Sequence, residues 1–258
     1  MRRILLTALV VLVAICSTGL AQDAVPLEVL QRTVFIKAGP EAGTAFAVDY
    51  RGKMYVITAR HVVAGVPTRN AIIQVWQKDQ WKEYTTVKTI FPSSDNVDIA
   101  IFETSEKVET PYLVTIATDE GPALGQPVWF LGYPFGIASH FNEGSIKTLP
   151  LVSMLPFVKR GTMSAFDATR PDAAVLYIDG FNNPGFSGGP ILFWSFSKHK
   201  YEITGVVMGY REDTAKILIN GQHVDTQLLV NSGILVGYSI GHAIEAIEKD
   251  EKQSEATK

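Results

Sequence analysis

The sequence predicts an all-β fold in two halves, followed by one short C-terminal helix. Short apolar runs rich in Val, Ile, Phe and Tyr alternate with turn-forming residues over 32–102 and again from 126 onward, a pattern typical of strands joined by hairpins. Helical spacing of apolar residues is confined to about 240–249. Of the 258 residues, 47% are hydrophobic and 19% are charged, so the chain can bury a sizeable core.

Residues 1–21 have the pattern of a cleaved signal peptide. Two arginines stand near the start, an apolar run from Ile4 to Ile15 follows, and Gly19 and Ala21 are small residues at the positions that a signal peptidase reads. The apolar run is shorter than the roughly 20 residues of a membrane span. We therefore expect export to the periplasm or the medium, with cleavage after Ala21 and no membrane contact afterwards.

Cleavage would leave a cysteine-free chain with a mild negative charge. Cys16 is the one cysteine, and Ile15 before it does not suit a lipoprotein signal, in which a small residue usually precedes the cysteine. Loss of two of the 23 basic residues leaves 21 against 26 acidic residues, a net charge of −5. This acidity, without any basic run, argues against nucleic acid and against an anionic membrane surface as partners.

The first half, about 30–120, predicts two hairpins and a further strand. The stretch TAFAVDYRGKMYVITA turns at Arg51-Gly52, and AIIQVWQKDQWKEYTTV turns near Lys78-Asp79. The stretch VDIAIFE follows as a strand. Gly and Pro in TDEGPALGQP then indicate a boundary near Glu120.

The second half, about 121–240, repeats the strand pattern and ends in the helix. Its predicted strands are in QPVWFLGYPFG, KTLPLVSML, AAVLYIDG, GPILFW, YEITGVVMGY and SGILVGYSI. Ser239 is placed to cap the helix over about 240–249, whose apolar side would pack on the β domain. We expect a folded domain over 22–248 and a frayed polar tail over 249–258.

Ser187 lies in a glycine-rich run, NNPGFSGGPILF, that fits two enzyme signatures. One is the G-x-S-x-G elbow of α/β-hydrolases, which needs a helix after the serine and the acid and histidine later in the chain. Glycines, a proline and a strand follow Ser187 instead, and of the later candidates, Asp225 and His242, the histidine falls in the predicted helix. An esterase of that class is therefore the weaker alternative.

The other signature places a histidine and an acid before the serine. YVITARHVVAG puts His61 just after a strand, and DNVDIAIFE puts Asp98 at the start of one. With GTAFAVD, FLGYPFG and RGTMSAF in the same order, the sequence over about 43–247 resembles the trypsin-like peptidase superfamily, closest to its bacterial HtrA-type branch. The resemblance implies two six-stranded antiparallel β-barrels of the chymotrypsin type. No PDZ domain, which HtrA relatives commonly carry, is expected in this chain.

The resemblance implies an exported serine endopeptidase that acts on unfolded or extended polypeptides. His61 would accept the proton of the Ser187 hydroxyl, Asp98 would orient the imidazole, and the backbone N–H groups of Gly185 and Ser187 would form the oxyanion hole. Asp95 is the rival acid, but the family pattern places the aspartate immediately before Ile-Ala-Ile. A catalytically silent binding protein of the same fold is the alternative, and the presence of all three residues argues against it.

By the same resemblance, Phe181 lies near the base of the specificity pocket, and Asn182 and Met208 line its walls. No acidic residue stands at this base, so we expect an uncharged, apolar substrate side chain there. Segment 210–233 is longer than the resemblance predicts, and it could shape specificity, form a homo-oligomer contact or be a variable surface hairpin. The scattered histidines match no metal-binding spacing, so neither a metal nor a cofactor is expected.

Phe186 precedes the serine where digestive relatives have an aspartate that pairs with a newly cut N-terminus. A phenyl ring cannot accept that ammonium group, and an unpaired buried charge is costly. We therefore expect packing, with Phe186 buried as an anchor, or assembly with other subunits to order the loop.

Overall fold

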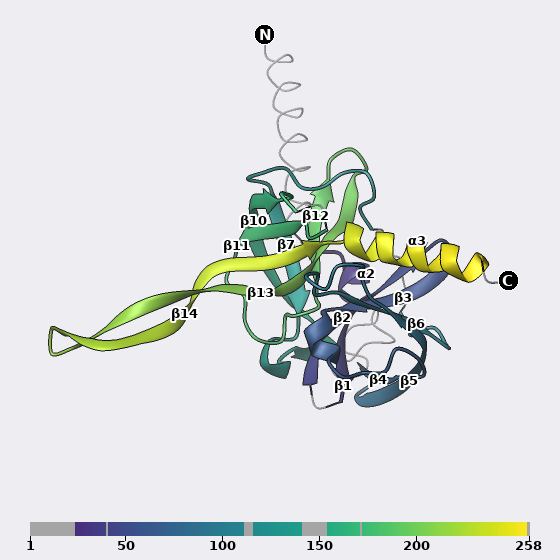
Figure 1. Ribbon diagram of the computed structural model, residues 1–258, viewed down its shortest axis with the longest axis horizontal. Helices are drawn as coiled ribbons and strands as arrows, with labels where there is room; N and C mark the ends of the chain where they lie inside the picture. Colours follow the sequence, from purple (N-terminus) through teal and green to yellow (C-terminus); the bar gives the residue numbers. More distant parts are fainter. Residues whose placement is uncertain (1–23, 40, 111–115, 141–153, 171, 257–258) are drawn as a thin grey trace, which may run out of the picture.

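The computed structural model describes residues 24–39, 41–110, 116–140, 154–170 and 172–256. The expected signal peptide, 1–21, lies outside the described residues. Two barrels stand side by side, and the C-terminal helix crosses from the second barrel onto the first (Figure 1). Among the described residues, no helix is both long and apolar enough to cross a membrane.

The first barrel closes through six antiparallel strands in the order β1-β2-β3-β6-β5-β4. The strands are β1 (Thr33–Ala38), β2 (Glu41–Tyr50), β3 (Lys53–Thr58), β4 (Ile72–Gln77), β5 (Gln80–Ile90) and β6 (Ala100–Thr104), preceded by the short helix α2 (Leu27–Leu30). Both predicted turns are confirmed. Arg51 and Gly52 have φ values of 49° and 79°, and Lys78 and Asp79 have values of 50° and 59°. Two consecutive positive φ angles are typical of type I′ hairpins, whose twist matches that of the strands.

The second barrel closes in the order β10-β11-β14-β13-β12-β7. Its strands are β7 (Pro127–Gly132), β10 (Phe157–Asp167), β11 (Val175–Asp179), β12 (Pro190–Ser195), β13 (Lys200–Ile219) and β14 (Gln222–Ser239). Between β7 and β10 lie the 3₁₀ turn η3 (Pro134–Gly136) and the short pair β8 (Ser139–His140) and β9 (Met154–Leu155). The prediction of two six-stranded antiparallel barrels is confirmed.

The hydrophobic core lies inside each barrel and also between them. The cluster between the barrels joins Phe46 and Ile57 of the first barrel to Leu131 and Leu192 of the second. Ile247 of the C-terminal helix α3 (Gly241–Glu255) belongs to the same cluster and is fully buried. Apolar burial of this kind is the main favourable term in folding, so the shared cluster fixes how the two barrels face each other.

Helix α3 continues beyond 249 to Glu255. The prediction of a frayed tail is therefore wrong for 249–255. The polar residues of its last turns bind the first barrel. The carboxylate of Asp250 pairs with Lys88, Glu251 accepts a hydrogen bond of 3.3 Å from the Tyr55 hydroxyl, and Glu248 lies 2.5 Å from Arg51. These partners are distant in sequence, so the helical pattern alone could not indicate them.

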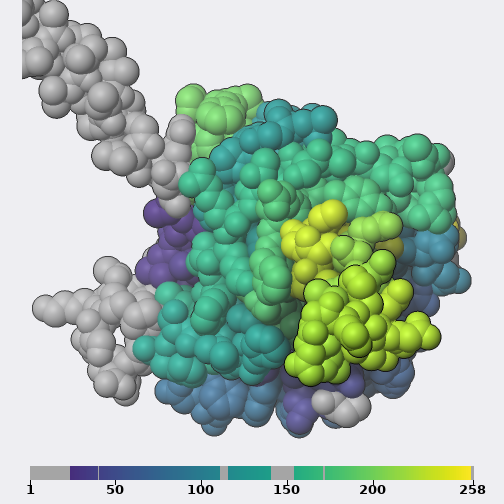
Figure 2. Space-filling model, turned by 90° about the vertical axis from the view of Figure 1, so that its left-hand side faces the viewer, coloured from purple at the N-terminus to yellow at the C-terminus, as the bar shows by residue number. Residues whose placement is uncertain are grey.

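Strands β13 and β14 run on beyond the barrel as a two-stranded ribbon, residues 210–233 (Figure 1). Asn220 and Gly221, with φ values of 51° and 78°, close its tip. In Figure 2 the ribbon, in yellow-green, projects toward the viewer from the face of the two barrels. The long segment that the sequence left open is therefore a protruding hairpin.

Candidate active site

His61 is held on the 3₁₀ turn η2 (Arg60–Val63), which follows β3. Val62 and Val63 are buried, and they anchor the turn on the barrel while His61 remains exposed. Asp98 lies just before β6, the neighbour of β3. Its Oδ1 accepts a hydrogen bond of 2.9 Å from the His61 backbone N–H, and its Oδ2 lies 2.5 Å from His61 Nδ1. The rival acid Asp95 lies 2.9 Å from the Arg60 guanidinium instead.

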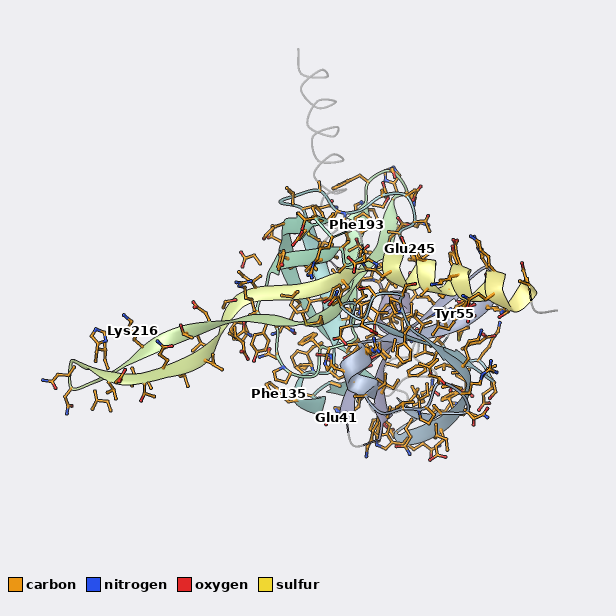
Figure 3. All side chains as sticks on the ribbon, in the orientation of Figure 1. Glu41, Tyr55, Phe135, Phe193, Lys216 and Glu245 are labelled. Carbon is orange, nitrogen blue, oxygen red and sulfur yellow. The ribbon has the colours of Figure 1, made fainter. Side chains whose placement is uncertain are left out.

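The contact with Asp98 fixes the protonation of the imidazole. A carboxylate can only accept, so Nδ1 carries the proton and Nε2 is left as the basic nitrogen. The hydrogen bond to Asp98 raises the pKa of His61, burial lowers it, and the charges of Asp98 and Glu41 raise it further. Glu41 is labelled at the edge of the first barrel in Figure 3. The net effect is a raised pKa, which makes His61 a stronger base than a free histidine.

The loop that carries Ser187 is built around glycines that no other residue could replace. Gly188 has a φ of 83°, and a Cβ there would lie 2.1 Å from the Thr44 carbonyl oxygen. Gly185 has a φ of 101°, and a Cβ there would lie 2.3 Å from the Tyr133 carbonyl oxygen. Glycine alone tolerates both the positive φ and these close approaches, which explains the composition of the run around Ser187.

Thr44 on β2 clamps this loop to the first barrel. Its hydroxyl donates to the Gly185 carbonyl at 2.7 Å and accepts from the Tyr133 N–H at 3.1 Å. Its backbone N–H donates to the Ser187 carbonyl at 3.0 Å, and its own carbonyl accepts from the Thr58 hydroxyl at 2.7 Å. Thr44 is fully buried. Sequence reasoning missed this residue, although the motif GTAFAVD contains it.

Phe186 anchors the loop from the side of the second barrel. It is fully buried, as expected, and packs edge-on against Phe130 with 5.2 Å between ring centroids. The Lys159 ammonium lies 5.2 Å from the Phe186 ring centroid and donates to the Phe181 carbonyl at 2.7 Å and to the Asn183 side chain. Burial lowers the pKa of Lys159. A single lysine in a strand gives no signal in the sequence, so Lys159 was also missed.

Ser187 and His61 are not hydrogen-bonded to each other in the structure. The Ser187 hydroxyl donates to the Met208 carbonyl at 3.1 Å. Catalytic hydrogen bonds are often absent or long without substrate. The N–H groups of Gly185 and Ser187 donate to no other described residue, so both are free to bind an oxygen atom with negative charge.

The three residues predicted for the specificity pocket lie in different surroundings. Met208, half-buried, contacts Ser187 as described above. Phe181 is 56% exposed; its carbonyl accepts from Lys159, and the same ammonium lies 5.7 Å from the centroid of its ring. Asn182 is buried, its side chain accepts from the Asn183 N–H at 2.8 Å, and its carbonyl accepts from Asn231 on β14 at 2.6 Å. Of the three, Met208 has a hydrogen bond with Ser187, and the specificity pocket stays a prediction.

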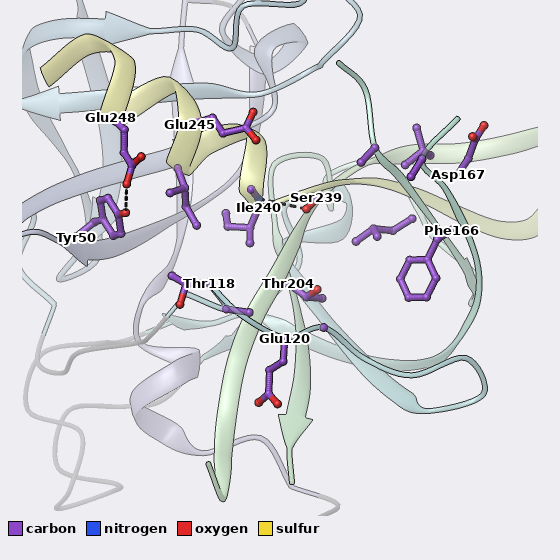
Figure 4. A pocket seen from close by; sticks show the side chains of 18 residues that line it. Tyr50, Thr118, Glu120, Phe166, Asp167, Thr204, Ser239, Ile240, Glu245 and Glu248 are labelled. Carbon is purple, nitrogen blue, oxygen red and sulfur yellow. Dashed lines mark hydrogen bonds between the residues drawn. The ribbon is translucent and has the colours of Figure 1, made fainter. Parts of the chain in front are cut away.

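The candidates for the esterase alternative lie apart. His242 is buried in α3 and its Nε2 accepts the Ala174 N–H at 2.8 Å, whereas Asp225 is exposed on the ribbon. A cavity of about 630 Å³ lies between the second barrel and α3, with Glu120 and Glu245 in its lining (Figure 4). His61, Asp98 and Ser187 do not line it, so this cavity is separate from the candidate active site.

The family follows from comparison with known proteins. A family model described as a trypsin-like peptidase domain matches residues 43–193, more than half of the chain. The chain belongs to this family. The matched range contains the Asp98–His61 pair and the whole serine loop.

Two curated relatives of this trypsin-like peptidase support the HtrA-type branch. The chain is 27% identical over 180 residues to Protease Do-like 1, chloroplastic, from Arabidopsis thaliana. The matched region covers 70% of this chain and 35% of that protein. It is 28% identical over 149 residues to Serine protease Do-like HtrA from Lactococcus lactis subsp. cremoris, with 55% and 31% covered. The chain spans about a third of the length of these curated relatives.

Solved structures share the fold of this trypsin-like peptidase. The HtrA-type protease AlgW with tripeptide has a TM-score of 0.55 at 17% identity, covering 86% of this chain and 60% of that one. The active form of the Rv3671c protease from M. tuberculosis has a TM-score of 0.54 at 19% identity, covering 86% and 81%. At these identities the likeness establishes the fold alone, and the resemblance to the HtrA branch is confirmed by the two curated relatives.

Proposed function

We propose that this trypsin-like peptidase is a serine endopeptidase that cleaves unfolded or extended polypeptides through an acyl-enzyme. Ser187 is the nucleophile, His61 the general base and acid, and Asp98 the residue that orients the imidazole. The observation that carries the proposal is the 2.5 Å contact between His61 Nδ1 and Asp98 Oδ2, in a chain whose serine loop is clamped to the same barrel by Thr44.

The proposed reaction begins when the Ser187 hydroxyl leaves the Met208 carbonyl and donates to His61 Nε2. Attack on the peptide carbonyl forms the carbon–oxygen bond while the proton moves to Nε2, and the N–H groups of Gly185 and Ser187 bind the resulting oxyanion. The carbon–nitrogen bond then breaks as His61 Nε2 gives its proton to the leaving amine, and the acyl group stays on Ser187 as an ester. Water then attacks the ester with His61 as the base, which releases the acid and restores the Ser187 hydroxyl. The negative charge of Asp98 stabilises the imidazolium in both halves of the reaction.

Hydrolysis of casein tests the proposal against a binding protein without turnover. Wild type and Ser187→Ala are purified side by side, and the release of peptides is followed by mass spectrometry. An endopeptidase produces internal cleavages that the variant does not. If wild type binds casein but releases no peptides, the protein is a binding protein of the same fold; if both preparations cleave equally, the activity belongs to a contaminant.

We expect kcat/KM to rise with pH as His61 loses its proton. The reaction needs neutral His61, so activity falls as the pH drops through the pKa of His61 in the folded protein. Asp98 raises this pKa, so Asp98→Asn should move the acidic limb of the profile to lower pH. The same change should reduce kcat by roughly 10⁴-fold, because it leaves the wrong nitrogen protonated.

The measurement is kcat/KM between pH 5 and 9, a range chosen around the usual pKa of histidine, about 6.5. Asp95→Asn is the matched control, since Asp95 pairs with Arg60 and not with His61. It should keep both the wild-type limb and the wild-type rate. An acidic limb that stays in place in Asp98→Asn would contradict the assigned pair.

Thr44→Val should lower kcat more than it changes KM. Valine keeps the shape of threonine but removes the hydroxyl that donates to Gly185 and accepts from Tyr133. A misplaced oxyanion loop costs on the order of 10² in rate. Thr44→Ser keeps the hydroxyl and should recover most of kcat. Equal losses in both variants, or a change in KM alone, would show that Thr44 does not position the loop.

We also propose export through residues 1–21. The exported protein should begin at Gln22 and should be indifferent to reducing agents, because Cys16 leaves with the signal peptide. Intact mass spectrometry of the protein from the periplasm and the medium measures this directly. A retained Cys16, or a lipid-sized mass increment on it, would contradict export with cleavage after Ala21.

A further inference from the structure

The ribbon 210–233 leaves one edge of β13 unpaired. On this edge β13 pairs with β12 as far as Val206. Val207 then accepts from the Gly188 N–H and donates to the Gly189 carbonyl, both at 2.8 Å. From Gly209 to Ile219 the edge has no strand partner in the part of the chain that the structure describes. Such an edge presents N–H and carbonyl groups that can pair with another extended chain.

This free edge starts at the candidate nucleophile. Ser187 donates its hydroxyl to the carbonyl of Met208, the residue that follows Val207. From there β13 continues to Ile219, next to the tip of the ribbon at Asn220, with shifts in its register against β14 between Tyr210 and Glu212 and between Lys216 and Leu218. An extended polypeptide that pairs with this edge would therefore have one end beside Ser187.

The ribbon also has an apolar face. Residues that pair across two strands lie on the same face, so Ala215 shares a face with its partner Leu228. Ile217 and Ile219 follow on that face by alternation along β13. Leu228 is 56% exposed and Ile219 is 59% exposed.

The opposite face of the ribbon is mixed, because Leu229, the partner of Thr214, and Leu218 lie there with 64% and 58% of their surface exposed. It carries the pairs Glu212 with Asn231 and Lys216 with Gln227; Lys216 is labelled in Figure 3, far out on the ribbon. A lone two-stranded ribbon is only marginally stable in water. A third strand would pair the free edge, and its side chains would cover the apolar face.

Strand direction decides which part of a substrate fits. Antiparallel pairing is slightly more stable than parallel pairing. Since β13 runs from Met208 toward the tip, an antiparallel chain runs from the tip toward Ser187. The residues on the ribbon would therefore precede the bond that is cleaved.

We propose that the ribbon is an extended substrate-binding strand. A polypeptide segment on the N-terminal side of the scissile bond pairs with β13 between Arg211 and Ile219. Apolar side chains at every second position of that segment lie over Ala215, Ile217 and Ile219. The proposal rests on the function proposed above, and it defines the substrate class as polypeptides with a long, extended, apolar stretch before the cleavage site.

Matched fluorescent peptides test this proposal. All share one cleavage sequence mapped in casein; one is short, one has an added N-terminal stretch of alternating Val and Thr, and one has the same stretch on the C-terminal side. The N-terminal stretch should lower KM on the order of tenfold through main-chain pairing. The C-terminal stretch should give no gain. N-methylation of alternate amides in the N-terminal stretch should abolish the gain without any change to the protein.

Protein variants locate the gain on the ribbon. In one variant, Asn-Gly replaces 213–230 and joins Glu212 to Asn231, which are paired neighbours suited to a two-residue turn. In a milder variant, Ile217→Lys, a charge replaces an apolar side chain. Both should lose the gain, measured as the ratio of kcat/KM for the long and short peptides. Lys216→Ser, on the opposite face, should retain it. An undiminished ratio in the shortened ribbon, or no gain in wild type that cleaves the short peptide, overturns the proposal.

The short peptide separates this proposal from the proposed function. If no peptide is cleaved, the proposed function fails. Fluorescence anisotropy of the long peptide bound to Ser187→Ala then tests the ribbon alone. Loss of binding in the variant with the shortened ribbon supports the proposal, and equal binding overturns it. Sedimentation of wild type and the shortened variant tests the rival occupant, a second copy of the chain. A lower assembly mass after shortening would assign the edge to contacts between copies and overturn the proposal.

Discussion

Ser187→Ala and His61→Ala should each reduce kcat to a similar residual level, and the double variant should be no slower than either. A hydroxyl without a base is a poor nucleophile, and a base without a hydroxyl has no proton to accept, so the two residues act as one unit. The remaining rate, about 10³ to 10⁴ over water, would come from the oxyanion hole and substrate binding. Steady-state kinetics on one fluorescent peptide measures all three variants.

His140→Ala is the matched control for this comparison. His140 is an exposed histidine on β8 and has no contact with Asp98 among the described residues. The control should retain wild-type kcat. Strictly additive losses in the double variant would contradict the account, because they would mean that Ser187 and His61 contribute independently.

Phe186→Ala should impair both stability and catalysis. Truncation of a fully buried phenylalanine costs about 3–5 kcal/mol of unfolding free energy. The lost ring also anchors the loop between Gly185 and Ser187, so the oxyanion donors should lose their alignment and kcat should fall on the order of 10²- to 10³-fold. Urea denaturation and steady-state kinetics on the same preparations measure the two effects.

Phe193→Ala separates the two effects. Phe193 is buried in the same hydrophobic cluster as Phe186, but it lies within β12, after the loop has ended. We expect a similar loss of unfolding free energy with kcat close to wild type. If both variants lose kcat equally, destabilisation alone accounts for the loss, and Phe186 has no special part in ordering the loop.

Local signals in the sequence were sufficient for the hairpins and for the site motifs. The hairpins turn at Arg51-Gly52 and Lys78-Asp79, where the sequence predicts them, because a two-residue turn between apolar runs is a short-range signal. The order of His61, Asp98 and Ser187 was likewise readable from short motifs, and the structure places Asp98 against His61.

Features that depend on distant partners could not be predicted. The end of α3 depends on Lys88 and Tyr55, which lie in the other barrel and bind carboxylates that look like a solvated tail in the sequence. Thr44 contacts the serine loop across more than 100 residues of sequence, and Lys159 contacts it across more than 20. Phe181 contacts Lys159 of β10 through its carbonyl and its ring, and a local pattern does not show this partner 22 residues away.

The proposed function requires that Ser187 is an activated nucleophile beside a formed oxyanion hole. A fluorophosphonate probe measures this directly, because it reacts well only with such a serine. Each folded chain should carry one label, mapped to Ser187 by peptide mass spectrometry and absent from Ser187→Ala. Folded wild type that stays unlabelled, or that carries the label on another residue while Ser187 is unmodified, would contradict the proposed function.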